Sequence, residues 1–187
     1  MKLIRLPEER ERRLVFYLAM EEYLARYTEG EAFFVWRVPP TVIIGRNQLM
    51  AAEVNLGYCR EHGVQVYRRK SGGGCVYSDM GNLMISYVTS GDDVPFIFAG
   101  YMQRLALCLR RMGAEAEISG RNDILVGGRK VSGNAFYSLH GRNIIHGTLL
   151  FNSSTADLER AITPSESKLR SKGVASARQR VANLRDI

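Results

Sequence analysis

The stretch SGRNDILVGGRKVSGNAF, residues 119–136, predicts a β-hairpin. A strand-like run leads to Val126, the pair Gly127–Gly128 follows, and a second strand-like run starts at Arg129. Two adjacent glycines between strands favour a two-residue turn, because the central positions of such turns need positive φ. The hairpin is antiparallel, so it sets the expected character of the sheet that the other strands join.

Outward from the hairpin, helical and extended patterns alternate along the chain. In residues 8–28, Phe16, Met20, Tyr23 and Tyr27 recur at three- and four-residue spacing, which predicts a helix with these residues along one face. The other expected helices cover 52–63, 94–112 and the region from Thr155, with a break near Pro164; the other expected strands cover 32–38, 41–45, 64–69, 75–79, 82–89 and 143–151. This mixture, with short turns between strands, predicts an α+β domain with a mixed, mainly antiparallel sheet flanked by helices.

The length and amino-acid composition limit the classes of protein to which this chain can belong. The 187 residues fit one domain, and 45% hydrophobic and 24% charged residues are ordinary for a globular protein. No apolar run approaches the roughly 20 residues that span a bilayer, and the N-terminal residues lack a secretory pattern. The three cysteines are widely spaced and form no CxxC pair, so neither a disulfide framework nor a zinc site is suggested. We expect one cytoplasmic domain with no membrane partner.

The net charge of +7 and the isoelectric point near 9.5 permit three kinds of partner: nucleic acid, an acidic protein or an anionic small substrate. The denser basic stretches are Arg68–Lys70 and the tail Lys168–Arg185. Charge spread in this way is more often a solvated surface than a binding site.

Lys130 is the first candidate for a residue of the functional site. A lysine within a strand usually faces solvent. Here, however, Asn122 and Asp123 begin the preceding strand, so the hairpin could bring them beside Lys130. Gly133 would also let a ligand approach the backbone close to this lysine. We therefore expect a pocket at the hairpin, in which Asp123 could hold Mg²⁺ together with substrate phosphates.

The glycine run Gly72–Gly74 is the second candidate. Consecutive N–H groups in a glycine turn can form a concave anion site, and Arg69 could add a planar fork of donors for phosphate or carboxylate. The alternative is a β-bulge or loop that binds nothing. The run is neither a Walker loop, since the Gly-Lys-Ser/Thr ending is missing, nor a Rossmann fingerprint, since a strand follows it.

His146 is the third candidate, in the apolar strand that contains HGTLLFN (146–152). A lone histidine in such a strand is more often a packed, hydrogen-bonded core residue than a catalyst.

Four motifs in order resemble the lipoate–protein ligase A family: RRKSGGGCVYSDMGNL (68–83), GRNDILVGGRKVSGNAF (120–136), HGTLLFN (146–152) and KLRSKGVASARQRVANL (168–184). The resemblance implies the catalytic-domain fold shared by lipoate and biotin ligases. It also implies the reaction, in which lipoate and ATP give lipoyl-AMP and pyrophosphate. The lipoyl group then passes to a lysine on a lipoyl domain of a 2-oxoacid dehydrogenase or on glycine-cleavage H protein.

The resemblance also implies which residues meet the substrates. Lys130 would stabilise charge on the α-phosphate and then hold the carbonyl oxygen of the mixed anhydride. Asp123 would be the magnesium ligand. The implied ATP and adenylate residues are Arg69, Ser71, Gly72, Gly73, Gly74, Cys75, Val76, Tyr77, Asn82, Asn122, Asp123 and Lys130. The implied lipoate residues are Arg69, Gly74, Lys130, Gly133 and His146.

The sequence departs from the family pattern at three places. Ser78 stands where the family often has histidine, and Cys75 stands where a small apolar residue is common. Ile187 lies about where the catalytic domain of long ligases gives way to a small C-terminal accessory domain. We therefore expect residues 1–187 to be a single catalytic domain, with the accessory domain absent from this chain or supplied by a separate protein. The basic tail would steer an acidic acceptor toward the site.

There are three alternatives to a lipoate ligase. An octanoyl- or lipoyl-transferase on the same fold needs a thiolate to carry the acyl group. Cys75 could supply it because it adjoins the expected pocket, whereas Cys108 is expected to be buried on its helix. A biotin ligase is disfavoured because a GRGRRG-type turn is absent. A nucleic-acid-binding protein is disfavoured because aromatic residues do not interleave with the basic runs.

Overall fold

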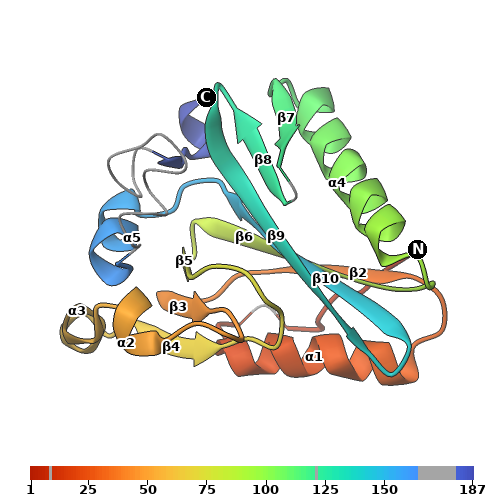
Figure 1. Cartoon of the computed structure of the whole chain (residues 1–187), viewed down its shortest axis with the longest axis horizontal. Helices are drawn as coiled ribbons and strands as arrows, with labels where there is room; N and C mark the ends of the chain where they lie inside the picture. The colour runs from red at the N-terminus through yellow and green to blue at the C-terminus, as the bar shows by residue number, and fades with distance from the viewer. Residues whose placement is uncertain (9, 121, 164–179) are drawn as a thin grey trace.

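The computed structural model describes residues 1–8, 10–120, 122–163 and 180–187. Its strands form two sheets, one with the order β1-β2-β6-β10-β9-β8-β7 and one with the order β4-β3-β5 (Figure 1). The strands of the large sheet are β1 (Lys2–Leu3), β2 (Ala32–Trp36), β6 (Asn82–Ser90), β7 (Ala116–Ser119), β8 (Asp123–Val126), β9 (Arg129–Leu139) and β10 (Arg142–Leu150). Those of the small sheet are β3 (Thr41–Ile44), β4 (Gln65–Arg68) and β5 (Val76–Ser78).

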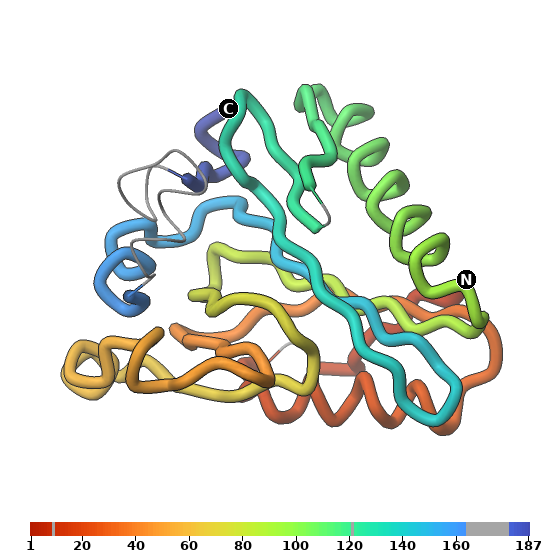
Figure 2. The backbone as a smooth tube through the Cα atoms, viewed as in Figure 1, coloured from red at the N-terminus to blue at the C-terminus, as the bar shows by residue number. Residues whose placement is uncertain are grey.

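Antiparallel pairing dominates the large sheet, as predicted, although the strands divide between two sheets rather than one, and the small sheet has one parallel and one antiparallel pair. The parallel pairs are β1 with β2 and β3 with β4. The predicted hairpin is β8–β9, and Gly127 and Gly128 form its turn at φ 57° and 73°. Strand β9 then pairs with β10 through Ser132–Leu139, which joins the hairpin to the middle of the large sheet, while the hairpin turn lies at the edge of the molecule near the C-terminus (Figure 2).

The large sheet lies between two helices, α1 (Leu14–Tyr27) and α4 (Val94–Arg111). Successive strand residues point to opposite faces, so Ile144 packs in the cluster with α1 and Ile145 in the cluster with α4. The small sheet packs against two short helices, α3 (Leu56–Glu61) and α5 (Thr155–Ala161). A further short helix, α2 (Met50–Glu53), has no buried residue. None of the described helices combines the length and the apolar character that a bilayer crossing requires.

Helix α1 differs from expectation in its start and in its buried face. It begins at Leu14 rather than near residue 8, and Leu14 is the first fully buried residue among those described in the expected range. The predicted face is largely exposed: Phe16, Tyr23 and Tyr27 keep 40%, 60% and 70% of their surface. The buried face carries Leu14, Tyr17, Glu21, Leu24 and Ala25.

The helix expected over 52–63 is two helices. Val54 is extended and forms a β-bridge with Ile162, which interrupts the helical backbone. The side chain of Asn55 then accepts a hydrogen bond from the N–H of Tyr58 and starts α3. The helix expected from Thr155 ends at Ala161; residues 164–179 of that expectation lie outside the described residues, and the chain closes with a 3₁₀ turn, Leu184–Asp186.

Candidate active site

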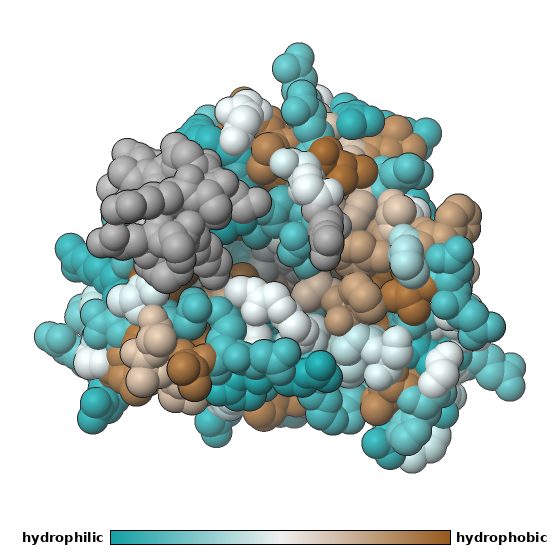
Figure 3. Space-filling model, in the orientation of Figure 1, coloured by the Kyte–Doolittle hydropathy of each residue, from teal (hydrophilic) through white to brown (hydrophobic). Residues whose placement is uncertain are grey.

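A cavity of about 290 Å³ lies where α1, the glycine turn and strands β8–β10 meet. Its lining divides into two groups. The larger nonpolar side chains are Leu14, Leu18, Trp36, Ile43, Val76 and Met84, and most of them belong to the core beneath α1. The polar side chains include Asn122, Asp123, Lys130, Asn134, Thr148 and Arg180. In Figure 3 the middle of this face is hollowed, with both hydrophilic and hydrophobic residues around the hollow.

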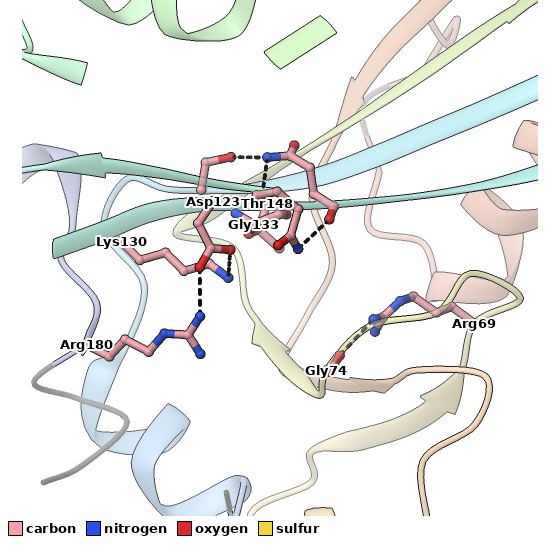
Figure 4. A network of polar contacts seen from close by, with 10 residues as sticks. Arg69, Gly74, Asp123, Lys130, Gly133, Thr148 and Arg180 are labelled. Carbon is pink, nitrogen blue, oxygen red and sulfur yellow. Dashed lines mark hydrogen bonds and ion pairs between the residues drawn. The ribbon is translucent and has the colours of Figure 1, made fainter. Parts of the chain in front are cut away.

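Asp123 joins two cations at the polar end of the cavity (Figure 4). Its Oδ1 lies 2.7 Å from Lys130 Nζ, and its Oδ2 accepts a hydrogen bond from Arg180 Nη2, also at 2.7 Å. The side chains of Asp123, Lys130 and Arg180 are 10%, 16% and 24% exposed. The hairpin thus brings Asp123 and Lys130 together, as the sequence predicted, and Arg180 joins them from the C-terminal segment.

The pKa of Asp123 reflects this setting. Burial would raise the pKa of the carboxyl, but Lys130 and Arg180 outweigh burial and hold the pKa below its usual value. Asp123 is therefore ionised at neutral pH and is a fixed counter-ion for both cations.

Gly133 makes room for Lys130. A Cβ at Gly133 would lie 2.4 Å from Lys130 Nζ and 2.6 Å from its Cε, so the lysine side chain crosses directly over this glycine. The N–H of Gly133 donates to Thr148 Oγ1 on β10 at 3.1 Å. The space that the sequence assigned to a ligand above Gly133 is thus filled by the lysine side chain.

Arg69 holds the glycine turn together. Its Nε donates to Ser71 Oγ at 2.9 Å, and its Nη1 donates to the carbonyl of Ile43 at 3.0 Å. Its Nη2 donates to the carbonyls of Gly72 and Gly74, both at 2.7 Å. Burial lowers the pKa of Arg69 to about 10, which still leaves it charged at neutral pH. The donors that were expected to meet phosphate or carboxylate are largely occupied by the protein backbone.

The turn also depends on a close backbone approach. A Cβ at Gly45 would lie 2.1 Å from the carbonyl oxygen of Gly73, so the end of β3 and the turn can touch only without a side chain there. Gly73 itself has φ 90°, whereas Gly72 has ordinary φ and open space around it. Two glycines near this turn are therefore required by geometry, and Gly72 is not one of them.

His146 connects the turn to α1. Its Nε2 lies 2.6 Å from Ser71 Oγ, and its Nδ1 lies 3.0 Å from Glu21 Oε1. Glu21 also accepts a hydrogen bond from Ser86 Oγ at 2.5 Å, and Ser86 Oγ accepts one from Trp36 Nε1 at 2.9 Å. His146 lines the cavity and is also part of a buried hydrogen-bond network. The sequence suggested either a packed core residue or a site residue, and the structure places His146 in both settings.

Two residues at the site, Glu21 and Arg180, were not predicted from the sequence as site residues. A signal for Glu21 existed: Tyr17 and Leu24 lie four residues before and three residues after it, so a carboxylate occupies the apolar face. Such a residue needs buried partners, which His146 and Ser86 supply. Arg180 was assigned to a basic tail that steers a partner, but its guanidinium lines the cavity.

Some predicted site residues lie outside the cavity lining. Those that line it are Arg69, Gly73, Gly74, Cys75, Val76, Asn122, Asp123, Lys130, Gly133 and His146, and those that do not are Ser71, Gly72, Tyr77 and Asn82. Tyr77 packs in the core between the small sheet and α5. Asn82 is buried and donates to Ser78 Oγ at 2.9 Å. Both residues help to fix the strands on either side of the cavity.

The cysteines occupy three environments. Cys75 lines the cavity beside Gly74, and Cys59 is buried, where burial raises the pKa of its thiol. Cys108 is exposed, so the expectation that it is buried was wrong. The buried residues of α4 are Tyr101, Met102, Ala106 and Leu109, and Cys108 lies off that face.

Comparison with known proteins identifies the family. The family model for the lipoyl protein ligase A/B catalytic domain matches residues 14–187. The lipoate-protein ligase LplJ of Bacillus subtilis (strain 168) is 43% identical over 170 residues, which cover 89% of this chain and 51% of that protein. The chain therefore spans about half the length of the curated relatives it matches.

Solved structures agree in fold. A bi-partite lipoate protein ligase from Thermoplasma acidophilum, studied with its E2 lipoyl domain, gives a TM-score of 0.86 at 30% identity, covering 100% of this chain and 75% of that one. A lipoate-protein ligase A bound with ATP gives 0.84 at 28% identity, covering 100% of this chain and 76% of that one. With the family model covering nearly the whole chain, this protein belongs to the lipoyl protein ligase A/B catalytic domain family.

Proposed function

We propose that this chain activates lipoate with ATP to form lipoyl-AMP and then transfers the lipoyl group to a lysine of an acceptor protein. One observation carries the proposal: the cavity joins a nonpolar recess to the ammonium of Lys130. Such a recess fits the hydrocarbon tail and dithiolane of lipoate, and the ammonium fits its carboxylate end. The relatives are named as lipoate-protein ligases, and one of the similar structures is bound with ATP.

The first step joins two anions, so it needs fixed positive charge that holds them in line. A carboxylate oxygen of lipoate forms a bond to the α-phosphorus of ATP, and the bond to the bridging oxygen breaks with release of pyrophosphate. Lys130 stabilises the charge on the α-phosphate. The turn that includes Gly73 and Gly74, held by Arg69, supplies backbone to the nucleotide side of the cavity.

In the second step, the acceptor lysine attacks the carbonyl carbon of lipoyl-AMP and AMP leaves. Lys130 then donates to the carbonyl oxygen as it gains negative charge. The acceptors we expect are the lipoyl domains of 2-oxoacid dehydrogenases or glycine-cleavage H protein. A similar ligase was studied with its E2 lipoyl domain, which supports an acceptor of this class. We place the reaction in the cytoplasm.

The contacts of Asp123 do not fit the magnesium site expected there. Each carboxylate oxygen already contacts a cation, and Lys130 and Arg180 would repel a third. We propose that Asp123 is the counter-ion of these two residues and that Mg²⁺ reaches the site with the phosphates of ATP.

We also propose that a further domain or a separate protein assists the first step, since the curated relatives are about twice as long. The chain alone should then transfer the lipoyl group from preformed lipoyl-AMP faster than it makes lipoyl-AMP. Full-rate adenylate formation by the chain alone would contradict this assistance.

The direct test measures pyrophosphate released from ATP with and without lipoate, and lipoyl-AMP by mass spectrometry. We expect release that depends on lipoate, followed by a mass increase of the lipoyl domain at one lysine. Release independent of lipoate, together with no transfer from preformed lipoyl-AMP, would contradict the proposed function.

The alternative is an octanoyl- or lipoyl-transferase that carries the acyl group on Cys75, because this thiol lines the cavity. Adenylate chemistry needs no thiol, so Cys75→Ser should keep most of the activity. An acyl-enzyme that is detected by mass spectrometry and is absent from Cys75→Ser would favour the transferase.

A further inference from the structure

We propose that Arg180 binds the departing pyrophosphate part of ATP, the β- and γ-phosphates, while Lys130 serves the α-phosphate. This inference rests on the proposed function. It starts from the position of the guanidinium, which lines the cavity and contacts the same carboxylate as Lys130 (Figure 4).

The backbone around Arg180 is fixed to the site. Val181 forms a parallel β-bridge with Lys130, and the N–H of Ala182 donates to the carbonyl of Lys130 at 3.0 Å. Ala182 is buried in the same cluster as Ile124 of β8. Next, the side chain of Asn183 accepts a hydrogen bond from the N–H of Ser153 and donates to the Ser153 carbonyl. Arg180 is therefore set beside Lys130 by paired backbone and a packed side chain.

Asp123 holds the ammonium of Lys130 and the guanidinium of Arg180 next to each other. Its two oxygens each contact one cation at 2.7 Å, so the ammonium and the guanidinium are held side by side. A guanidinium carries five N–H donors in a planar fork, and the contact with Asp123 uses Nη2. The fork can therefore keep Asp123 and still offer an edge to phosphate oxygens, which suits an arginine better than a lysine.

The two cations differ in their exposure to solvent. Lys130 lies over Gly133 inside the hairpin and is the less exposed of the two, at 16% against 24% for Arg180. A lipoate tail in the recess would present its carboxylate, and hence the α-phosphate, to Lys130. The β- and γ-phosphates continue away from the recess, so the more exposed guanidinium is placed to meet them.

In this arrangement Arg180 stabilises the pyrophosphate leaving group as its bond to the α-phosphorus breaks. When the carboxylate oxygen of lipoate bonds to the α-phosphorus, the electron pair of the breaking bond moves to the bridging oxygen of pyrophosphate. Negative charge grows on that leaving group, and a guanidinium stabilises it by charge-assisted hydrogen bonds. Lipoyl-AMP has no β- or γ-phosphate, so Arg180 has no such contact in the transfer step.

The test compares Arg180→Gln with the full wild-type chain in binding and in each half-reaction. Losing hydrogen bonds to a charged group should weaken binding of ATP and of pyrophosphate about 10- to 100-fold. Binding of AMP and transfer from preformed lipoyl-AMP should stay near wild type. Arg180→Lys should recover part of the loss. Arg185→Gln, which removes the same charge from an exposed position in the same segment, should leave the binding of ATP, pyrophosphate and AMP unchanged.

Several outcomes separate the possibilities. Equal losses for AMP and ATP, or for both half-reactions, would show a structural role and overturn the inference. A folded Arg180→Gln that binds ATP and pyrophosphate like wild type would also overturn it. If Arg180→Gln does not fold, the same affinities are compared in Arg180→Lys, where unchanged ATP and pyrophosphate binding counts against the inference. A wild-type chain that binds neither ATP nor lipoate would instead contradict the proposed function itself.

Discussion

Ser71 Oγ lies 2.6 Å from His146 Nε2, and both side chains are buried. Ser71 also accepts a hydrogen bond from Arg69 Nε, and Glu21 lies at the other ring nitrogen of His146. If His146 Nδ1 donates to Glu21, its Nε2 is an acceptor for the Ser71 hydroxyl, and each of these donors from Arg69, Ser71 and His146 has a partner. The glycine turn is thereby connected to helix α1 through strand β10.

Glu21→Gln should disturb this connection. The substitution keeps the shape of the side chain but removes the charged acceptor for His146 and Ser86. Weakening a buried hydrogen bond to a charged group costs about 1–3 kcal/mol, so the free energy of unfolding should fall by that amount. Affinity for lipoate should fall with it, because His146 lines the cavity. Denaturant unfolding and lipoate titration measure the two effects.

Glu22→Gln is the matched control, one residue further along the same helix. Its partner is Lys70, at 2.5 Å, whose side chain is mostly exposed. Such pairs contribute about 0–1 kcal/mol, so this variant should be nearly neutral in both measurements. Equal losses in the two variants would mean that the buried network has no special role.

The hairpin shows how much the sequence could predict. The glycine pair at 127–128 and the strands around it required only local rules, and the structure confirms both the turn and the approach of Asp123 to Lys130. The antiparallel character of the sheet followed from the same local signals. Its division into two sheets depends on which strands meet across long separations, and no local pattern records that.

Helix α1 and Arg180 show where sequence reasoning ends. Apolar residues occupy two faces of α1, and the face that packs against the sheet contains Glu21. Its carboxylate can be buried there because His146 and Ser86, which are distant in sequence, supply hydrogen-bond partners. Spacing alone favoured the other face. Arg180 reaches the site through backbone pairing of the next residue, Val181, with Lys130, fifty-one positions earlier in the chain. Its charge was visible in the sequence, but its neighbours were not.

Lys130→Ala should leave the fold intact and slow formation of lipoyl-AMP by roughly 10²–10³-fold, the usual loss for one donor that stabilises a developing negative charge. Transfer from preformed lipoyl-AMP should slow as well, since the same ammonium serves both steps. Single-turnover kinetics of each step measure these losses. Arg129→Ala, an exposed neighbour, is the control, and near-normal adenylate synthesis by Lys130→Ala would contradict its assignment.

Gly133→Ala should act on the same lysine indirectly. The added methyl would lie 2.4 Å from Lys130 Nζ, so the flexible end of the lysine must move while the backbone can stay. We expect a thermal midpoint close to wild type and a rate of adenylate formation between those of wild type and Lys130→Ala. Full activity in this variant would show that the position of the ammonium is not critical.

Gly45→Ala should disrupt the glycine turn. The new Cβ would lie 2.1 Å from the Gly73 carbonyl oxygen, which is backbone and can move only if the turn separates from β3. Overpacking of this kind costs about 1–3 kcal/mol, and ATP binding should weaken with it. Gly72→Ala is the comparison for stability, because Gly72 has open space around it, and its unfolding free energy should match wild type. Equal stability of the two variants would rule out this role for Gly45.

Asp123→Asn tests the counter-ion through pH. At neutral pH the variant leaves Lys130 and Arg180 without their shared carboxylate and should unfold about 1–3 kcal/mol more easily than wild type. The folded pKa of Asp123 lies below its usual value, because the two cations outweigh burial, so the folded state favours the ionised carboxylate. This stability is present above the unfolded pKa of about 3.9 and is lost as the pH falls through the folded pKa.

The difference in unfolding free energy between wild type and Asp123→Asn should therefore be level from pH 7 to about pH 5 and shrink below about pH 4. Urea unfolding at a series of pH values measures it, with exposed Asp186→Asn as the control for removal of a carboxylate. A difference that vanished near pH 6 would mean that another group controls the site. A difference unchanged at pH 3 would mean that the charge of Asp123 does not stabilise the fold, and that its shape alone positions Lys130 and Arg180.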